Sequence, residues 1–201
     1  VAGDADRTWP YSPEVEFAVR RCIDSIWNPG WHSLACLEHD LNVNNMAFGA
    51  DGKNLVTASD DNTAVIYDVD TGLPLNTLMH GQRVNCVAYS PDGNLIATGC
   101  RDKIVRIYDA ESGKCLYETE KGGNPWFITF DKDGSHALSA TSNGLISLNL
   151  ENGTAPSCGF RMGYISKESI TDDGNDFALH FGNNLYAIDY QYLFSSFIPK
   201  L

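Results

Sequence analysis

Apolar side chains recur along this chain in short runs, and polar turn residues separate one run from the next. Within each run the apolar positions lie two or three residues apart, and β-branched and aromatic side chains are frequent. This spacing is typical of strands in a sheet, where alternate side chains point to opposite faces. The pattern therefore predicts an all-β protein built from short strands.

Four Asp-Gly pairs mark turns between these runs at a nearly constant interval. They begin at Asp51, Asp92, Asp133 and Asp173, so the steps are 41, 41 and 40 residues. The Gly of such a pair supplies the positive φ that a tight hairpin turn requires. A period of ~40–45 residues is the size of one four-stranded propeller blade. The interval predicts repeat units near residues 43–83, 84–124, 125–164 and 165–201, within a repeat region that spans 32–201.

The first two units share further residues at matching positions. A His precedes the first strand, an Asp lies in the turn after the second strand, and Tyr-Asp ends the third strand. The residues are His39, Asp61, Tyr67 and Asp68 in unit one, and His80, Asp102, Tyr108 and Asp109 in unit two. In this pattern the chain resembles the WD40 repeat family, with Tyr in place of the family's Trp. Units three and four depart from the pattern, since Lys121 and Asn143 replace the His and the Asp of unit three.

The resemblance implies a β-propeller and a structural role for these eight residues. In the family the His, a Ser or Thr, the Asp and the Trp form one hydrogen-bonded set within a blade. The number of blades stays open, because about seven units of this length would need close to ~290 residues and the chain has 201. It is a segment of a longer chain, or it completes a ring with a second chain, or it closes as a smaller propeller.

The first 31 residues do not repeat and are interpreted as an N-terminal extension. Ser12-Pro13-Glu14 has the residues of a helix start: an N-cap, a proline at the first position and an acid near the positive end of the dipole. Apolar residues then recur with helical spacing at Val15, Val19, Cys22 and Ile26. We expect a helix over residues 13–27 whose apolar stripe packs on the propeller or binds a partner. Residues 31–38 are expected to form the outer strand of an incomplete blade.

Charge and cysteine content narrow the possible functions. The net charge of −12 disfavours a general nucleic-acid binder, which usually presents a basic face, although six of the 14 Lys and Arg residues lie between 83 and 121. No run of apolar residues approaches the ~20 of a membrane span. The six cysteines include no CxxC pair, so no zinc site is predicted and free thiols favour the cytoplasm or nucleus.

The sequence offers no catalytic constellation. Phosphate-binding glycine loops, the GxSxG elbow and the HExxH metal motif are all missing from it. Ser135-His136 is improbable as a nucleophile-and-base pair, because no acid that would orient the His can be assigned. We therefore expect a protein that is not an enzyme and needs no cofactor or metal.

Partner binding is expected on one face of the propeller. The family layout places Arg83, Asn85, Arg101, Lys121 and Trp126 on a single rim of units two and three. Arg and aromatic side chains are the enriched anchors of protein interfaces, and Arg recognises carboxylate and phosphate in bidentate fashion. The hypothesis is a scaffold or adaptor that binds a partner protein through an acidic or phosphorylated peptide. The alternatives are a Trp126 packed between blades beside solvated cations, a ubiquitin-ligase substrate receptor, and recognition of a nucleoprotein through the basic stripe of unit two.

Overall fold

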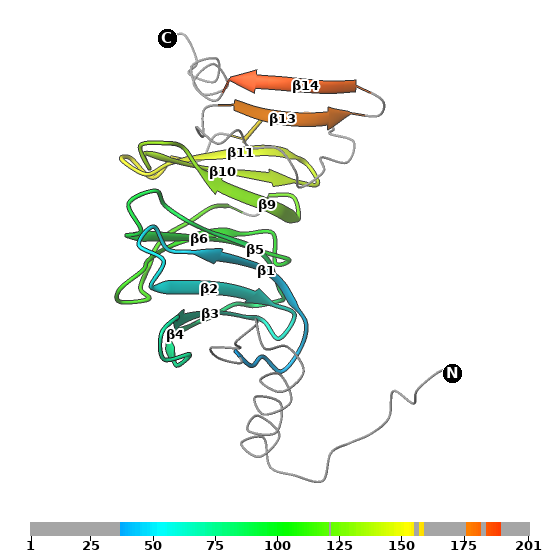
Figure 1. Ribbon diagram of the computed structural model, residues 1–201. Coiled ribbons are helices and arrows are strands. Elements are labelled where there is room, and N and C mark those ends of the chain that lie inside the picture. Colours follow the sequence, from blue (N-terminus) through cyan, green and yellow to red (C-terminus); the bar gives the residue numbers. More distant parts are fainter. Residues whose placement is uncertain (1–36, 121, 155–156, 159–175, 182–183, 190–201) are drawn as a thin grey trace, which may run out of the picture.

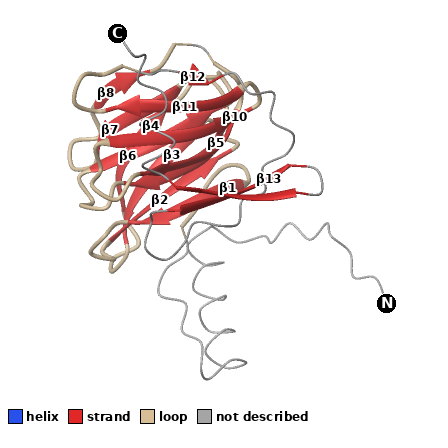
Figure 2. Ribbon diagram, turned by 90° about the horizontal axis from the view of Figure 1, so that it is seen from above, coloured by secondary structure: helices blue, strands red, loops and turns tan. Residues whose placement is uncertain are grey.

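The computed structural model describes residues 37–120, 122–154, 157–158, 176–181 and 184–189. These residues contain strands and no helix (Figure 2), which confirms the predicted all-β fold. The helix expected over residues 13–27 lies outside the described residues, as does most of the strand expected over 31–38. Leu37 and Glu38, the described end of that segment, lie outside any strand.

Three sheets have four antiparallel strands each, paired in chain order. We call them blades one, two and three. Blade one contains β1 (Val43–Phe48), β2 (Asn54–Ser59), β3 (Thr63–Asp68) and β4 (Pro74–Met79). Blade two contains β5 (Val84–Tyr89), β6 (Leu95–Cys100), β7 (Val105–Asp109) and β8 (Cys115–Glu118). Blade three contains β9 (Pro125–Phe130), β10 (His136–Thr141), β11 (Gly144–Asn149) and β12 (Ser157–Cys158).

The blades are stacked face to face in the order of the sequence (Figure 1). A two-stranded sheet of β13 (Asp176–Phe181) and β14 (Asn184–Asp189) lies beyond blade three. The first strands of successive blades are neighbours, since β1 contacts β5 and β5 contacts β9. This is the arrangement of propeller blades, in which each sheet packs on the next around the innermost strands.

Apolar side chains fill the space between neighbouring blades. The cluster between blades one and two includes Val56, Ile66, Val84 and Ile96, all almost fully buried. A second cluster, between blades two and three, is built around Val105, Ile107 and Leu148. These are the apolar positions of the sequence pattern, and their burial supplies the main driving force for stacking.

The innermost strand of each blade has a bulge at its start, and in blades one and two the bulged residue reaches the next blade. Asn44 and Asn85 are skipped in the pairing of their strands with β2 and β6, as Trp126 is in blade three. The Asn44 amide donates to the carbonyl of Val84 at 2.9 Å. The Asn85 amide donates to the carbonyl of Pro125 at 2.7 Å. Two equivalent asparagines therefore link each blade to its successor.

In blade one the implied hydrogen-bonded set forms around His39. Its Nδ1 lies 2.8 Å from a carboxylate oxygen of Asp61, and its Nε2 lies 2.6 Å from the hydroxyl of Thr57. Because a carboxylate only accepts, Nδ1 carries the proton. Burial raises the pKa of Asp61, but hydrogen bonds from Thr63 and His39 outweigh it and lower that pKa to about 2. Tyr67, which replaces the family's Trp, donates its hydroxyl to the carbonyl of Glu38.

In blade two the same residues form two separate groups of polar contacts, whereas the resemblance implies a single hydrogen-bonded set. Its His80 lies 3.0 Å from the carbonyl of Leu78 through Nδ1, and its Nε2 faces the hydroxyls of Thr98 and Tyr108. Asp102 instead contacts Arg106 at 2.8 Å. The position of Arg106 corresponds to Val65 of blade one, so one substitution in β7 gives the turn carboxylate a different partner.

The paired Asp residues at the ends of the third strands close the next turn. Asp68 accepts hydrogen bonds from the backbone and hydroxyl of Thr71. Asp109 accepts the same pair from Ser112. These local bonds lower the pKa of both carboxyl groups. Each Asp is therefore engaged in the turn that leads to the outer strand.

We expect the stability of the chain to fall as the pH drops from about 6.5 to about 4. Burial lowers the pKa of His80 to about 4, so the unfolded chain binds a proton more readily than the folded chain in that window. The resulting loss is at most roughly 3 kcal/mol. Urea unfolding at a series of pH values should show this slope in the parent and a flatter slope in His80→Asn. Equal slopes in the two proteins would contradict the assignment.

A methyl group at Gly99 should destabilise the contact between blades two and three. A Cβ there would lie 2.5 Å from Sγ of Cys86 and 2.7 Å from Cβ of Pro125, which belongs to blade three. Overpacking of this kind costs about 1–3 kcal/mol. Thermal unfolding should show the loss for Gly99→Ala, whereas the control Gly49→Ala, whose Cβ would meet nothing closer than 3.5 Å, should change stability by less than about 0.5 kcal/mol.

Candidate functional site: a basic rim on blade two

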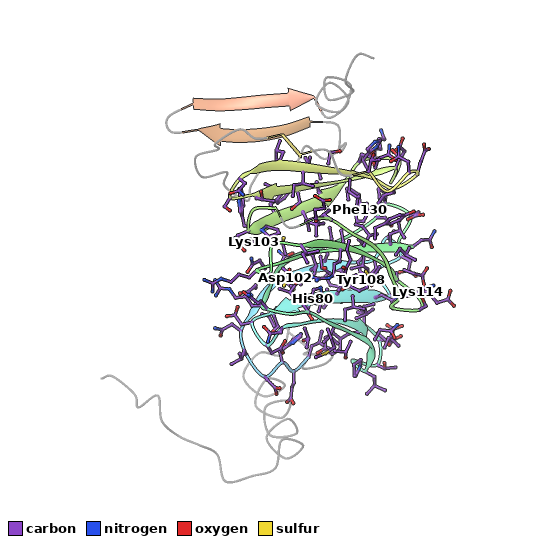
Figure 3. The ribbon with its side chains drawn as sticks, turned by 180° about the vertical axis from the view of Figure 1, so that it is seen from behind. His80, Asp102, Lys103, Tyr108, Lys114 and Phe130 are labelled. Atoms are coloured by element: carbon purple, nitrogen blue, oxygen red, sulfur yellow. The ribbon has the colours of Figure 1, made fainter. Side chains whose placement is uncertain are left out.

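The loops before the innermost strands and the turns between second and third strands meet at one rim of the stack, which we call the loop rim. The backbone N–H of Arg101 donates to the carbonyl of Arg83 within blade two. The N–H of Gly122, in the loop leading to blade three, donates to the carbonyl of Lys103. These bonds hold the β6–β7 turn, the loop before β5 and the loop before β9 together. The other rim carries the Asp-Gly turns, and Figure 3 shows Lys103 and Lys114 on opposite sides.

The structure brings three cationic residues together on the loop rim of blade two: Arg83, Arg101 and Lys103. Arg101 and Lys103 are exposed on either side of Asp102 in one turn, and Arg83 is half-buried. At the matching positions blade one has Asn42, Asp60 and Asn62. The positive charge is therefore a property of blade two and not of the repeat as such.

The acid in the middle of this turn already has a partner. Arg106 contacts Asp102 at 2.8 Å and Glu118 at 2.8 Å. Burial acts to lower the pKa of Arg106, but its bonds to these two carboxylates raise it overall. Arg106 is shared by the two carboxylates and offsets only part of the charge of Asp102, and Arg101 and Lys103 together still leave the turn net positive. Arg83 has a weaker acidic neighbour, since its guanidinium lies 3.8 Å from Asp60.

The remaining predicted site residues lie next to this group or outside the described residues. Trp126 is the bulged residue at the start of β9 and is partly exposed. Asn85 has its amide within reach of Asn124 and Pro125, so it contacts the next blade. Lys121 is not among the described residues. A role in partner binding for Arg83, Asn85, Arg101 and Trp126 stays a prediction that their shared rim makes reasonable.

Two contributors to this site are missing from the predicted group of five residues. Lys103 adopts a left-handed φ of 72° at the tip of the turn, and the local sequence has no Gly or Asn to signal it. Arg106 replaces an apolar residue at a position that the strand pattern assigns to the interior. A cation at a core position beside a turn Asp is the signal that could have found it.

A second polar cluster lies on the opposite rim of blade three. Nδ1 of His136 lies 2.7 Å from the hydroxyl of Ser135 and 3.0 Å from a carboxylate oxygen of Asp131, while Nε2 lies 3.0 Å from the amide of Asn149. A nucleophilic triad needs the hydroxyl and the carboxylate on opposite ring nitrogens. Here both meet the same nitrogen, so the cluster closes the β9–β10 turn and does not activate the hydroxyl.

The described residues offer neither a metal site nor a membrane-spanning helix. Among the described residues, His, Cys, Asp and Glu side chains nowhere gather in threes around a possible metal position. Over the same part of the chain no helix has the length and apolar character needed to cross a membrane.

Comparison with known proteins bears on the identity of these blades. The family model "WD domain, G-beta repeat" matches residues 31–68 and 72–109, which end with the third strands of blades one and two. Two solved structures, described as "Structure of U3-55K" and "Crystal structure of RRP9 WD40 repeats", are similar to the chain with a TM-score of 0.57 and 22% sequence identity. The match covers 60% of this chain and 39% of each of those chains. At this identity the likeness shows the fold alone.

No curated protein matches the chain. The family assignment depends instead on the two matched repeats, and the strand order of the blades agrees with them. Residues 31–68 and 72–109 are therefore WD40 repeats: the first ends with β3 of blade one, and the second supplies β4 of blade one and β5–β7 of blade two.

Proposed function

We propose that this chain is a non-catalytic protein-interaction scaffold that binds a partner protein through the loop rim of blades two and three. WD40 repeats generally serve as such scaffolds, and the two matched repeats support the general role. The observation that carries the choice of surface is the cluster of Arg83, Arg101 and Lys103 beside the partly exposed Trp126. A cationic group around an aromatic side chain fits the anchors that dominate protein interfaces.

The partner segment that this rim fits is acidic or phosphorylated. Arg101 has an exposed guanidinium that can give two parallel hydrogen bonds to a carboxylate or phosphate. The chain carries 26 acidic residues against 14 basic ones, so it is acidic as a whole. A local positive region on it would attract an anionic segment of a partner and orient that segment as the two molecules meet. The indole of Trp126 would add apolar contact next to this charge.

The compartment proposed for this function is the cytoplasm or the nucleus. Cys100 is buried and Cys115 is exposed, and both are free thiols. Free thiols are stable in reducing compartments. Other subunits of a multi-subunit complex are the partners that such a scaffold would bind there.

Replacing Arg101 and Trp126 together should abolish capture of the partner without unfolding the chain. A lysate pull-down would compare the parent with Arg101→Glu/Trp126→Ala and with Lys114→Glu, a control that makes the same charge change on the opposite rim. We expect the parent and the control to retain a set of proteins that the double variant loses. Phosphatase treatment of the lysate should reduce that set if phosphate is the recognised group.

Three results would contradict the proposal. Capture of the same proteins by the double variant would place the interaction elsewhere. Loss of the folded state in the double variant, seen as a changed melting temperature, would show that Trp126 supports the packing of the blades. Release of the captured material by nuclease, with a steep dependence on salt, would favour recognition of a nucleoprotein instead.

A further inference from the structure

The open face of blade one exposes large apolar side chains. Met46 is 63% exposed and Phe48 is 58% exposed, both on the innermost strand. Met79, at the end of the outer strand, is 71% exposed. Strand pairing places these residues on one face, because Met46 is opposite Thr57, Phe48 is opposite Leu55, and Met79 is opposite Thr63. The other face of blade one packs on blade two.

Blade two shows what a neighbouring blade covers on the equivalent face. Val87 and Tyr89, which are 41 residues after Met46 and Phe48, pack against blade one. Tyr108 of β7 also joins this contact. The rest of the outer half is charged: Arg106 pairs with Glu118, and Glu118 and Glu120 lie on the outer strand or just after it. A neighbouring blade therefore covers this face as far as Tyr108 and leaves its outer edge to charged residues.

The outer half of the open face of blade one is different in character. Its three matching residues are Val65, Thr77 and Met79, where blade two has Arg106, Glu118 and Glu120. None of the three is charged, and β4 as a whole carries no charged residue. An edge strand without charges is a site for further contacts. Packing of one more blade would not by itself explain why this outer half is apolar, because the matching edge of blade two, which does pack on a blade, is charged.

The described chain begins on this same face. The carbonyl of Glu38 accepts a hydrogen bond from Tyr67 on β3, and His39 contacts Thr57 on β2. Residues 28–36 then separate this point from the segment 13–27, whose apolar stripe consists of Val15, Val19, Cys22 and Ile26. Nine residues can span up to about 30 Å. A helix over 13–27 would be about 22 Å long, close to the ~20 Å length of a six-residue strand such as β4.

We propose that residues 13–27 dock as an amphipathic helix on the outer half of the open face of blade one, with the apolar stripe along Thr77 and Met79 of β4, since Val65 of β3 is already buried. The segment is tethered to the face that it covers, so its effective concentration there is high. Its length and stripe match the strand it would cover. A helix docked in this way covers the outer part of the exposed end of the stack. It leaves the loop rim free for the proposed partner.

Photo-crosslinking of the full chain tests this contact. p-Benzoylphenylalanine would replace Met79 in one protein and Glu120, the matching position of blade two, in the control. We expect a crosslink from position 79 to residues 13–27 at the mass of one chain, and no such crosslink from position 120. Mass spectrometry of the digested product would identify the linked peptide.

A second pair of variants separates docking from a general effect on folding. Val19→Gln/Ile26→Gln removes two residues of the stripe, and Arg20→Gln/Asp24→Gln makes the same type of change on the opposite side of the helix. The stripe variant should lose the crosslink and increase hydrogen exchange in Pro74–Met79, whereas the control should keep both unchanged. A crosslink at the mass of two chains, a crosslink to any other segment, or no crosslink at all would overturn the proposal.

Discussion

The packing of each innermost strand against the next is the interaction on which the rest of the structure depends. Val84 and Ile96 of blade two are fully buried against blade one, and Gly99 lets Cys86 and Pro125 approach closely enough to bring blade three into contact. The asparagine links at Asn44 and Asn85 orient this packing. Both rims, and with them the cationic loop cluster, keep their geometry only while the blades are held in this register.

Much of the fold could be predicted from the sequence, because the information is local and repeated. The Asp-Gly interval and the apolar runs predicted blades whose strands the structure shows, and the likeness to the WD40 family is confirmed by the matched repeats. The turn of unit three was interpreted as an equivalent of the earlier turns. It is one residue shorter, since Ala140 pairs with Leu145 across four residues where Ala58 pairs with Ala64 across five.

The site was less predictable, because its contacts join residues that sequence spacing does not relate. Arg83 and Arg101 could be placed on one rim from the family layout. The division of the hydrogen-bonded set in blade two could not, because it depends on Arg106 being the partner of Asp102 while His80 contacts the carbonyl of Leu78. The contact of Asn85 with blade three could not be predicted either. The sequence does not tell whether an asparagine amide faces the central channel of a propeller or bonds to the next blade.

The links between blades all join units that are adjacent in the chain, and this has a consequence for how the protein folds. The two asparagine links span 40 residues each, so no described link of this kind closes a loop longer than one repeat. Arrays with nearest-neighbour coupling fold by growth from a formed pair of units and lose their end units first. Blade two, with a neighbour on each side, is then the natural nucleus. Assembly would proceed outward from it, and the rim that we assign to partner binding would be among the earliest surfaces to form.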